Sequence, residues 1–323
     1  MKTQTLGKSS LVSSRLSYGC MRIPGTWKPQ AITPEMEARG RRSVIAAYEA
    51  GYTLFDHADI YCQGESERIF GEALKEVSRM RDHVLIATKC GIVFAGQPSA
   101  GVPSPNGPHR YDFSPEHITW SCEQSLRRLG VETIDLYQLH RPDLLMDPPA
   151  VAEAFAKLRQ QGKVREFGVS NVAPSFLTAL QKACPFPLIV NQVEIHLGKL
   201  DALYDGTLDQ CLAEQITPLS WSPLGGGFLA TNGKPDPAGI PTQPPKDVAK
   251  KLLKEMDQVA AAYGVSRTVI AVVWLLKHPG RIIPIVGSNN PDHIREAARA
   301  DDVELSREDW YRLLVAARGK SLP

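Results

Sequence analysis

Short apolar runs alternate with longer amphipathic stretches along most of the 323-residue chain. Some of the short runs, such as the IIPIV part of 281–288, are almost wholly apolar, which is typical of strands buried on both faces. We expect strands in eight segments, at 15–19, 53–58, 83–89, 133–140, 164–171, 188–196, 216–223 and 281–288.

The stretches between these runs carry apolar residues at the helical period. Two of them begin with the same signal, Ser114-Pro115-Glu116 and Asn290-Pro291-Asp292, in which a capping side chain precedes a proline and an acid. One further helix is expected in the tail after Trp310. The other helices are predicted at 34–50, 65–80, 114–129, 148–162, 173–183, 203–215, 246–277 and 291–300.

Eight strand-then-helix units without a break in composition predict an α/β fold, a single (β/α)₈ TIM barrel over residues 1–323 with an N-terminal β-hairpin. The alternative is a doubly wound open sheet, which would carry a glycine fingerprint after its first strand. Residues 19–25 read GCMRIPG and lack that GxGxxG pattern. Barrel loops that follow strands lie over the active face, so we interpret 92–113 and 225–245 as walls or lids rather than plain surface insertions.

Composition narrows the class of protein. Hydrophobic residues make up 43% of the chain and charged residues 22%, and the net charge of +2 is too small and too evenly spread to indicate a nucleic-acid partner. The N-terminus has no apolar signal core, and the longest apolar run is too short to span a membrane. Six scattered cysteines suggest free thiols in a reducing compartment. We therefore expect a cytoplasmic protein without a membrane partner; the sequence leaves its oligomeric state open.

Polar residues follow the expected strands where a barrel would bring them together. Asp56 and Tyr61 follow the second strand, Lys89 ends the third and His140 ends the fourth. A lysine beside a phenol lowers its pKa, and a carboxylate keeps a buried lysine charged. A histidine can then orient a substrate carbonyl. Together the four residues predict a tuned general acid.

Taken alone, Asp56, Tyr61 and His140 are each more often structural than catalytic. Lys89 is harder to dismiss, because unpaired buried lysines are rare, and the combination favours catalysis. Cys90 adjoins Lys89, but side chains alternate along a strand, so we interpret it as packing. A metal site built on His57, Asp59 and His140 is a further possibility, yet the sequence lacks the additional ligands that such a site needs. No metal is therefore predicted.

Seven motifs in order resemble the aldo-keto reductases, which are NAD(P)H-dependent barrel enzymes that reduce aldehydes and ketones. The resemblance runs from about residue 4 to the end, and it implies that Tyr61 is the proton donor, Lys89 and Asp56 its tuning pair and His140 the carbonyl-orienting residue. The motifs are FDHADIY (55–61), ATK (87–89), QLHRPD (138–143), FGVSN (167–171), NQVE (191–194), WSPLGGG (221–227) and IPIVGS (283–288).

The same resemblance implies a cofactor site along the barrel mouth. It places the nicotinamide carboxamide on Ser170, Asn171 and Gln192, with Trp221 stacked under the nicotinamide ring. It places the pyrophosphate along Ser222, Leu224 and Gly226. The end of the last strand at Gly287 and the following segment are expected to hold the adenosine 2′-phosphate, through Ser288, Asn289, Asn290 and Arg295.

Some positions depart from the family pattern or leave a choice open. His293 stands where many members have an arginine on the 2′-phosphate, so NADPH is the expected cofactor and NADH remains possible. His57 stands where the family commonly has a small residue, and its side chain either lines the substrate pocket or points into the helix layer. Met21 and Trp27, in the loop after the first strand, are expected to line the substrate pocket. The expected binding partner is a small molecule with a carbonyl group. The alternative to an enzyme is a cofactor-sensing binding subunit, which would resemble the β subunits of potassium channels.

Overall fold

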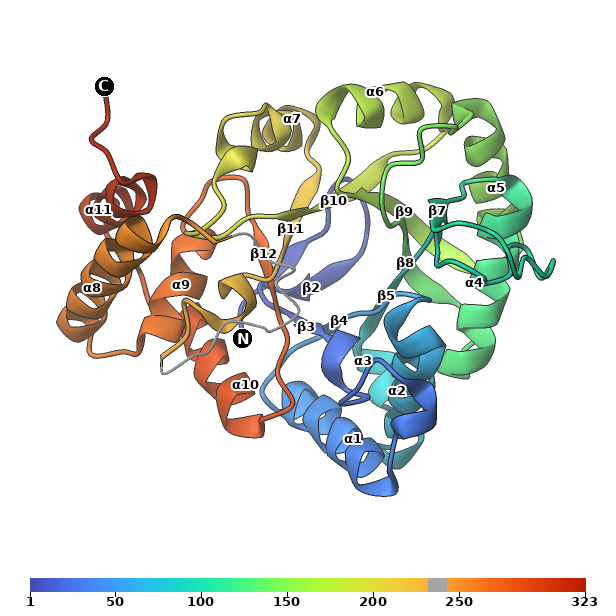
Figure 1. Ribbon diagram of the computed structural model, residues 1–323, viewed down its shortest axis with the longest axis horizontal. Coiled ribbons are helices and arrows are strands. Elements are labelled where there is room, and N and C mark those ends of the chain that lie inside the picture. The colour runs from blue at the N-terminus through green and yellow to red at the C-terminus, as the bar shows by residue number, and fades with distance from the viewer. Residues whose placement is uncertain (232–242) are drawn as a thin grey trace.

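Eight parallel strands close into a barrel in the computed structural model, which describes residues 1–231 and 243–323 (Figure 1). Residues Ser17 and Tyr18 of the first barrel strand pair with Ile285 and Val286 of the last, so the sheet has no edge there. This confirms the predicted (β/α)₈ barrel over the open sheet. The barrel strands are β3 (Ser17–Gly19), β4 (Leu54–Asp56), β5 (Leu85–Cys90), β8 (Ile134–Leu139), β9 (Val164–Ser170), β10 (Leu188–Glu194), β11 (Thr217–Trp221) and β12 (Ile283–Val286).

Helices surround the barrel and begin at the predicted caps. Ser114 accepts a hydrogen bond from the backbone N–H of His117, and Asn290 accepts one from the backbone N–H of Asp292. The helices flanking the strands are α1 (Pro34–Glu49), α2 (Glu65–Glu76), α3 (Met80–His83), α4 (Pro115–Leu129), α5 (Pro148–Gln160), α6 (Pro174–Ala183), α7 (Thr207–Glu214), α8 (Lys246–Tyr263), α9 (Arg267–Leu276), α10 (Pro291–Ala298) and α11 (Arg307–Arg318).

The prediction of a single helix over 246–277 is wrong. This segment contains two helices, α8 and α9, with a bend of 90° between them. Gly264 adopts a left-handed φ of 63° that ends α8, and Ser266 then caps α9 by accepting from the backbone N–H of Val269. The helix predicted at 65–80 ends earlier, at Glu76 in α2, because Val77 is extended, and Met80 already belongs to the separate short helix α3.

The predicted N-terminal hairpin forms the floor of the barrel. Strands β1 (Thr3–Thr5) and β2 (Val12–Ser14) pair antiparallel, and the loop between them inserts Leu6 and Leu11 among the apolar side chains of the barrel interior. The backbone N–H of Gly7 donates to the side chain of Thr217, at the start of β11. The opposite end, where the strands finish, is therefore the open mouth.

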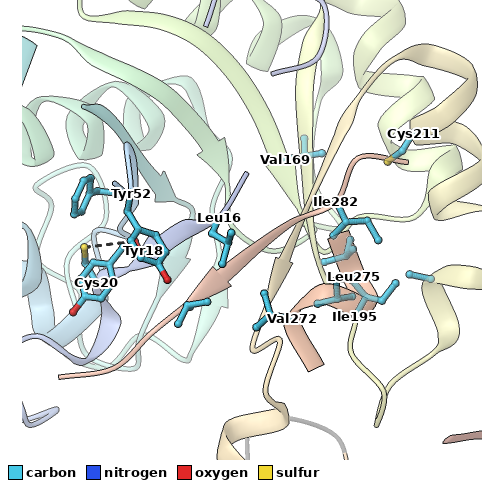
Figure 2. Packing of buried hydrophobic residues seen from close by; sticks show 14 of the residues in the cluster. Leu16, Tyr18, Cys20, Tyr52, Val169, Ile195, Cys211, Val272, Leu275 and Ile282 are labelled. Carbon is cyan, nitrogen blue, oxygen red and sulfur yellow. Dashed lines mark hydrogen bonds between the residues drawn. The ribbon is translucent and has the colours of Figure 1, made fainter. Parts of the chain in front are cut away.

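Apolar residues between the strands and the helices form the larger part of the core. Figure 2 shows Leu275 and Val272 of α9 packed near Ile282 and Ile195. On another side of the barrel, the rings of Phe155 and Phe167 stack with their centroids 4.2 Å apart. Burial of this layer fixes where each strand ends, and so fixes the position of the polar residues at the mouth.

One of the two long loops expected over the mouth contains a strand pair of its own. Within 92–113, β6 (Ile92–Val93) and β7 (Arg110–Tyr111) form a small antiparallel ladder. The loop at 225–245 starts with a 3₁₀ turn at Gly225–Gly227, and its central residues 232–242 lie outside the described part of the chain. Among the described helices, none is by itself long and apolar enough to cross a membrane; only the bent pair α8 and α9 passes such a test jointly.

Candidate active site

Lys89 and Asp56 form a buried ion pair in the barrel mouth. Asp56 is the last residue of β4 and Lys89 lies on the neighbouring β5, so the two side chains start from adjacent strand ends. The Lys89 ammonium donates to Asp56 Oδ2 at 2.9 Å and to the backbone oxygen of His57 at 2.6 Å. Gln192 of β10 donates from its amide to Asp56 Oδ1 at 2.8 Å. Both carboxylate oxygens are thus occupied, which stabilises the ionised pair.

Tyr61 completes this group from a short turn after β4. The Lys89 ammonium donates to the Tyr61 hydroxyl at 3.2 Å, and the Tyr61 ring meets the His140 ring edge to face at a centroid distance of 5.9 Å. The turn is shaped by left-handed φ angles of 49° at Cys62 and 54° at Gln63. The structure therefore brings all four predicted catalytic residues together, and Tyr61 is still 9% exposed at the mouth.

The protonation states follow from burial and from these contacts. Burial raises the pKa of Tyr61 above its usual value of 10.0, and Lys89 opposes that rise. The predicted influence of Lys89 is thus present, but burial outweighs it and the net change in pKa is upward. Burial by itself would lower the pKa of Lys89, yet Asp56 and Tyr61 raise it. Burial, helped by Lys89 and Arg141, lowers the pKa of His140 well below 6.5, so its imidazole is neutral.

The residues expected to bind the nicotinamide form a connected cradle on β9, β10 and β11. Asn171 has a left-handed φ of 59°, which turns its amide toward the mouth. Its nitrogen donates to Ser170 Oγ at 2.7 Å, and its oxygen accepts from the Trp221 indole at 2.8 Å. Ser170 in turn donates to the backbone oxygen of Gln192. Amide and hydroxyl groups of this kind suit the donors and acceptors of a carboxamide.

The two segments expected to hold phosphates have backbone shapes that suit them. Ser222 has φ of 50° and Gly226 has φ of 65°, and between them Leu224 packs partly against the core. At the end of β12, a Cβ on Gly287 would lie 3.4 Å from the backbone oxygen of Gly19, so the chain there runs close to β3. Gly226 and Gly287 carry no side chain, which would allow a ligand to approach the backbone closely at these positions.

The adenosine end of the expected site opens into a cavity of about 540 Å³. Ser288, Asn289 and Asn290 line this cavity, whereas Arg295 does not and is bound to Asp292 at 3.4 Å. Two arginines and a serine of α1 also line the cavity, and sequence reasoning missed all three. Their signal was a helical spacing that places them on one face of α1: Arg39, Arg42 and Ser43.

Of the three residues expected to contact substrate, two lie on the loop after β3 and one does not face the mouth. The Trp27 ring is 47% exposed and meets the Tyr61 ring at 6.4 Å, while Met21 is half-buried in the preceding turn. His57 is fully buried against Phe70 of α2, and its Nδ1 lies 3.3 Å from Ser66 Oγ. Because side chains alternate along the chain at the end of β4, Asp56 faces inward and His57 faces the helices. The expectation that His57 lines the substrate pocket is therefore corrected.

A sequence profile of the aldo/keto reductase family matches residues 15–315. The chain belongs to the aldo/keto reductase family. It is 37% identical to a 6-dehydroglucose reductase of Novosphingobium aromaticivorans over 98% of this chain and 96% of the other, and 38% identical to oxidoreductase YdhF of Escherichia coli over 93% and 94%. Its fold matches the glycerol dehydrogenase AKR11B4 of Gluconobacter oxydans with a TM-score of 0.84 and 27% identity, over 99% of this chain and 97% of that one.

As an aldo/keto reductase, the protein is an NAD(P)H-dependent oxidoreductase for carbonyl compounds. The residues present at the mouth suit that cofactor, because the amide–hydroxyl cradle, the half-buried ring of Trp221 and the open cavity follow one another along the rim. In the described part of the chain, no cluster of three or more potential ligands could hold a metal ion. Arg141, whose guanidinium lies 5.5 Å from the centre of the Trp221 ring, is a further mouth residue that sequence reasoning did not select.

Proposed function

We propose that this aldo/keto reductase uses NADPH to reduce aldehydes and ketones to alcohols, with Tyr61 as the proton donor. The observation that carries the proposal is the contact of 3.2 Å between the Lys89 ammonium and the Tyr61 hydroxyl, beside a neutral His140. A proton donor, a cation that stabilises its conjugate base and a hydrogen-bonding imidazole are the groups that a developing alkoxide requires.

The chain's own residues act on the carbonyl oxygen. His140 donates a hydrogen bond from its neutral imidazole and fixes the angle at which the carbonyl enters. Tyr61 transfers its hydroxyl proton to the same oxygen as negative charge develops there. Lys89 holds the resulting phenolate as an ion pair, and Asp56 and Gln192 keep Lys89 in place. The bound nicotinamide supplies the hydride that reduces the carbonyl carbon.

The raised pKa of Tyr61 is consistent with this role. A phenol whose pKa lies above 10.0 is protonated at neutral pH and so has a proton to donate, although burial makes it a weaker acid. Donation then depends on charge that appears on the substrate oxygen only in the transition state, where Lys89 acts most strongly. The same burial that raises the pKa also excludes water from the transfer.

Sugar-derived carbonyl compounds are the first substrate class to examine. Two relatives named 6-dehydroglucose reductase, from Novosphingobium aromaticivorans and Agrobacterium fabrum, are 37% and 35% identical to this chain. Trp27 supplies a flat exposed ring beside Tyr61, and such rings pack against the apolar face of a sugar. We therefore place hydroxylated aldehydes ahead of large apolar ketones.

The experiment measures loss of NADPH absorbance with a panel of substrates that includes 6-dehydroglucose, simple sugars and 4-nitrobenzaldehyde, and it compares the wild type with Tyr61→Phe. We expect Tyr61→Phe to lower kcat by about 10²–10⁴-fold while the Kd for NADPH changes by less than about threefold. Tyr311→Phe, on the outer helix α11, is the matched control and should leave kcat unchanged.

Two outcomes contradict the proposal. Near-normal turnover in Tyr61→Phe would remove its role as proton donor. Tight NADPH binding with only slow turnover of every carbonyl compound would instead favour the alternative, a cofactor-sensing subunit like those of potassium channels, which retains its product cofactor.

A further inference from the structure

We infer that Arg39 and Arg42 of α1 hold the 2′-phosphate of the cofactor and so select NADPH over NADH, in place of Arg295. The inference rests on the proposed function, because it assigns residues to the far end of the same dinucleotide site. The cavity of about 540 Å³ is lined by α1 on one side and by the segment that joins β12 to α10 on the other. A cavity of this volume can hold an adenosine with its phosphate.

The two arginines line the cavity, and among the described residues they have no carboxylate partner. Arg39, Arg42 and Ser43 follow one another at helical spacings of three and four residues, so they share one face of α1. Arg41 points away from that face and pairs with Glu37 and Glu76. Within residues 1–231 and 243–323, no acid lies within ion-pair distance of Arg39 or Arg42. Two free guanidinium groups at one cavity are suited to a doubly charged anion, because each can bind phosphate oxygens through two N–H groups.

In the described part of the chain, the opposite wall offers hydrogen-bonding groups but no free cation. Arg295 is engaged by Asp292 at 3.4 Å, and Asp292 stands in the first turn of α10. Within the described residues, neither Arg295 nor His293 contributes to the lining. Asn290 uses its side chain to cap α10. A phosphate that entered here would therefore find its counter-charge on α1.

Hydrogen bonds fix the segment 288–289 of one cavity wall relative to α1 and to the barrel. Ser43 Oγ of α1 donates to the backbone oxygen of Asn289 at 3.1 Å, and the hydroxyl of Tyr18 donates to the backbone oxygen of Ser288 at 2.7 Å. Ser43 lies one residue beyond Arg42, so this bond fixes the arginines relative to the rim. The backbone of the site is therefore fixed before a ligand binds, and only the exposed side chains of Arg39 and Arg42 have to be ordered.

The cavity also lies where a dinucleotide from the barrel mouth would arrive. Gly287 follows the last residue of β12 at the rim, and the cavity begins with the next residue, Ser288. β12 pairs with β11, which carries Trp221 of the nicotinamide cradle. A ligand that lies along the rim from Trp221 past Gly287 thus reaches Arg39 and Arg42 with its adenosine end.

The experiment uses two nucleotides that differ only by the 2′-phosphate, 2′,5′-ADP and 5′-AMP, and measures their Kd values by calorimetry with the full-length protein. We expect Arg42→Ala and Arg39→Ala each to weaken 2′,5′-ADP about tenfold, and the double variant about 100-fold, with 5′-AMP unchanged. Arg42→Lys should retain part of the affinity, since it keeps the charge but loses the planar fork. Arg41→Ala is the control on the same helix and should leave both Kd values unchanged.

The outcomes separate this inference from the proposed function. If the double variant binds 2′,5′-ADP as the wild type does while Arg295→Ala weakens it, the phosphate is held from α10 and the inference is wrong. Equal weakening of 5′-AMP would also overturn it, because the arginines would then serve the common part of the ligand. A wild-type protein that binds neither nucleotide nor NADPH would instead refute the proposed function itself. Both arginines are exposed, so their removal should leave the melting temperature within a few degrees of the wild-type value.

Discussion

The Lys89 ammonium lies 3.2 Å from the Tyr61 hydroxyl, and it reaches this position because Asp56 holds it from the neighbouring strand at 2.9 Å. All three side chains are buried or nearly so, and a lone ammonium in such a place would lose its proton. The carboxylate therefore does more than balance charge, because it keeps a cation at the one point where a phenolate would form.

Replacement of Lys89 by Met tests that relationship. We expect kcat to fall by at least about 100-fold at neutral pH, because the pKa of Tyr61 would rise further and the phenolate would lose its counter-ion. Steady-state kinetics with NADPH provides the measurement. Loss of Lys89 also leaves Asp56 without its cation, so a second variant, Lys89→Met with Asp56→Asn, should recover the melting temperature without recovering turnover. Wild-type kcat in either variant would contradict the assigned role.

The pH profile of the reduction gives a second test. Tyr61 has a pKa above 10.0 and His140 has one well below 6.5, so neither group changes its protonation state between these limits. We expect kcat/KM for reduction to be flat from pH 6.5 to about 9 when it is measured with saturating cofactor in buffers of constant ionic strength. A steep limb near pH 7.5 would show that another group, or a different protonation state of His140, governs the reaction.

His57 makes the folded protein sensitive to acid. Burial and Lys89 lower its pKa from 6.5 to about 3, so the unfolded chain takes up a proton that the folded chain does not. Its contribution to stability is complete above pH 6.5 and is lost as the pH falls toward 3. Relative to pH 7, His57→Gln should reduce the acid-induced loss of unfolding free energy at pH 4 by about 3 kcal/mol.

Urea denaturation at the two pH values provides that measurement. The exposed His83 offers a matched control, and His83→Gln should keep the acid sensitivity of the wild type. An acid sensitivity that is equal in His57→Gln and in the wild type would show that other buried groups cause it.

The outer helix α11 is attached to α9 through a pair of tryptophans. The rings of Trp274 and Trp310 stack 5.1 Å apart, and each indole N–H donates to the backbone oxygen of the other residue. Trp310→Ala should lower the free energy of unfolding by about 2–3 kcal/mol, and Trp310→Phe should lose less because it keeps the stacked ring. Neither change should alter kcat at temperatures where the protein is folded. A loss of turnover in Trp310→Ala would link α11 to the barrel mouth.

Much of the fold could be predicted because its signals are local. An apolar run such as 282–286 can be satisfied only by burial on both faces, and eight such runs separated by helical patterns leave few arrangements other than a closed barrel. The break at Gly264 was missed because the apolar period continues from α8 into α9, although the left-handed φ of Gly264 and the cap at Ser266 divide the two helices.

The four catalytic candidates were also accessible to sequence reasoning. Asp56, Lys89 and His140 stand at or just beyond strand ends, and parallel strands in a barrel all finish at one rim, so their proximity follows from the fold class. Tyr61 belongs to the same set because a short turn carries it back over the mouth.

Side-chain orientation, burial and pKa shifts at the site depend on contacts between distant segments, so only the tertiary structure decided them. It turned His57 toward Phe70, and it buried Tyr61 so deeply that its pKa rises despite Lys89. It also set α1 against α10, where Arg39 and Arg42 meet a segment about 250 residues further along the chain. Periodicity along a chain records which face of an element is buried, but it contains no distance between elements. Burial, and the charge that a buried group can carry, depend on those distances.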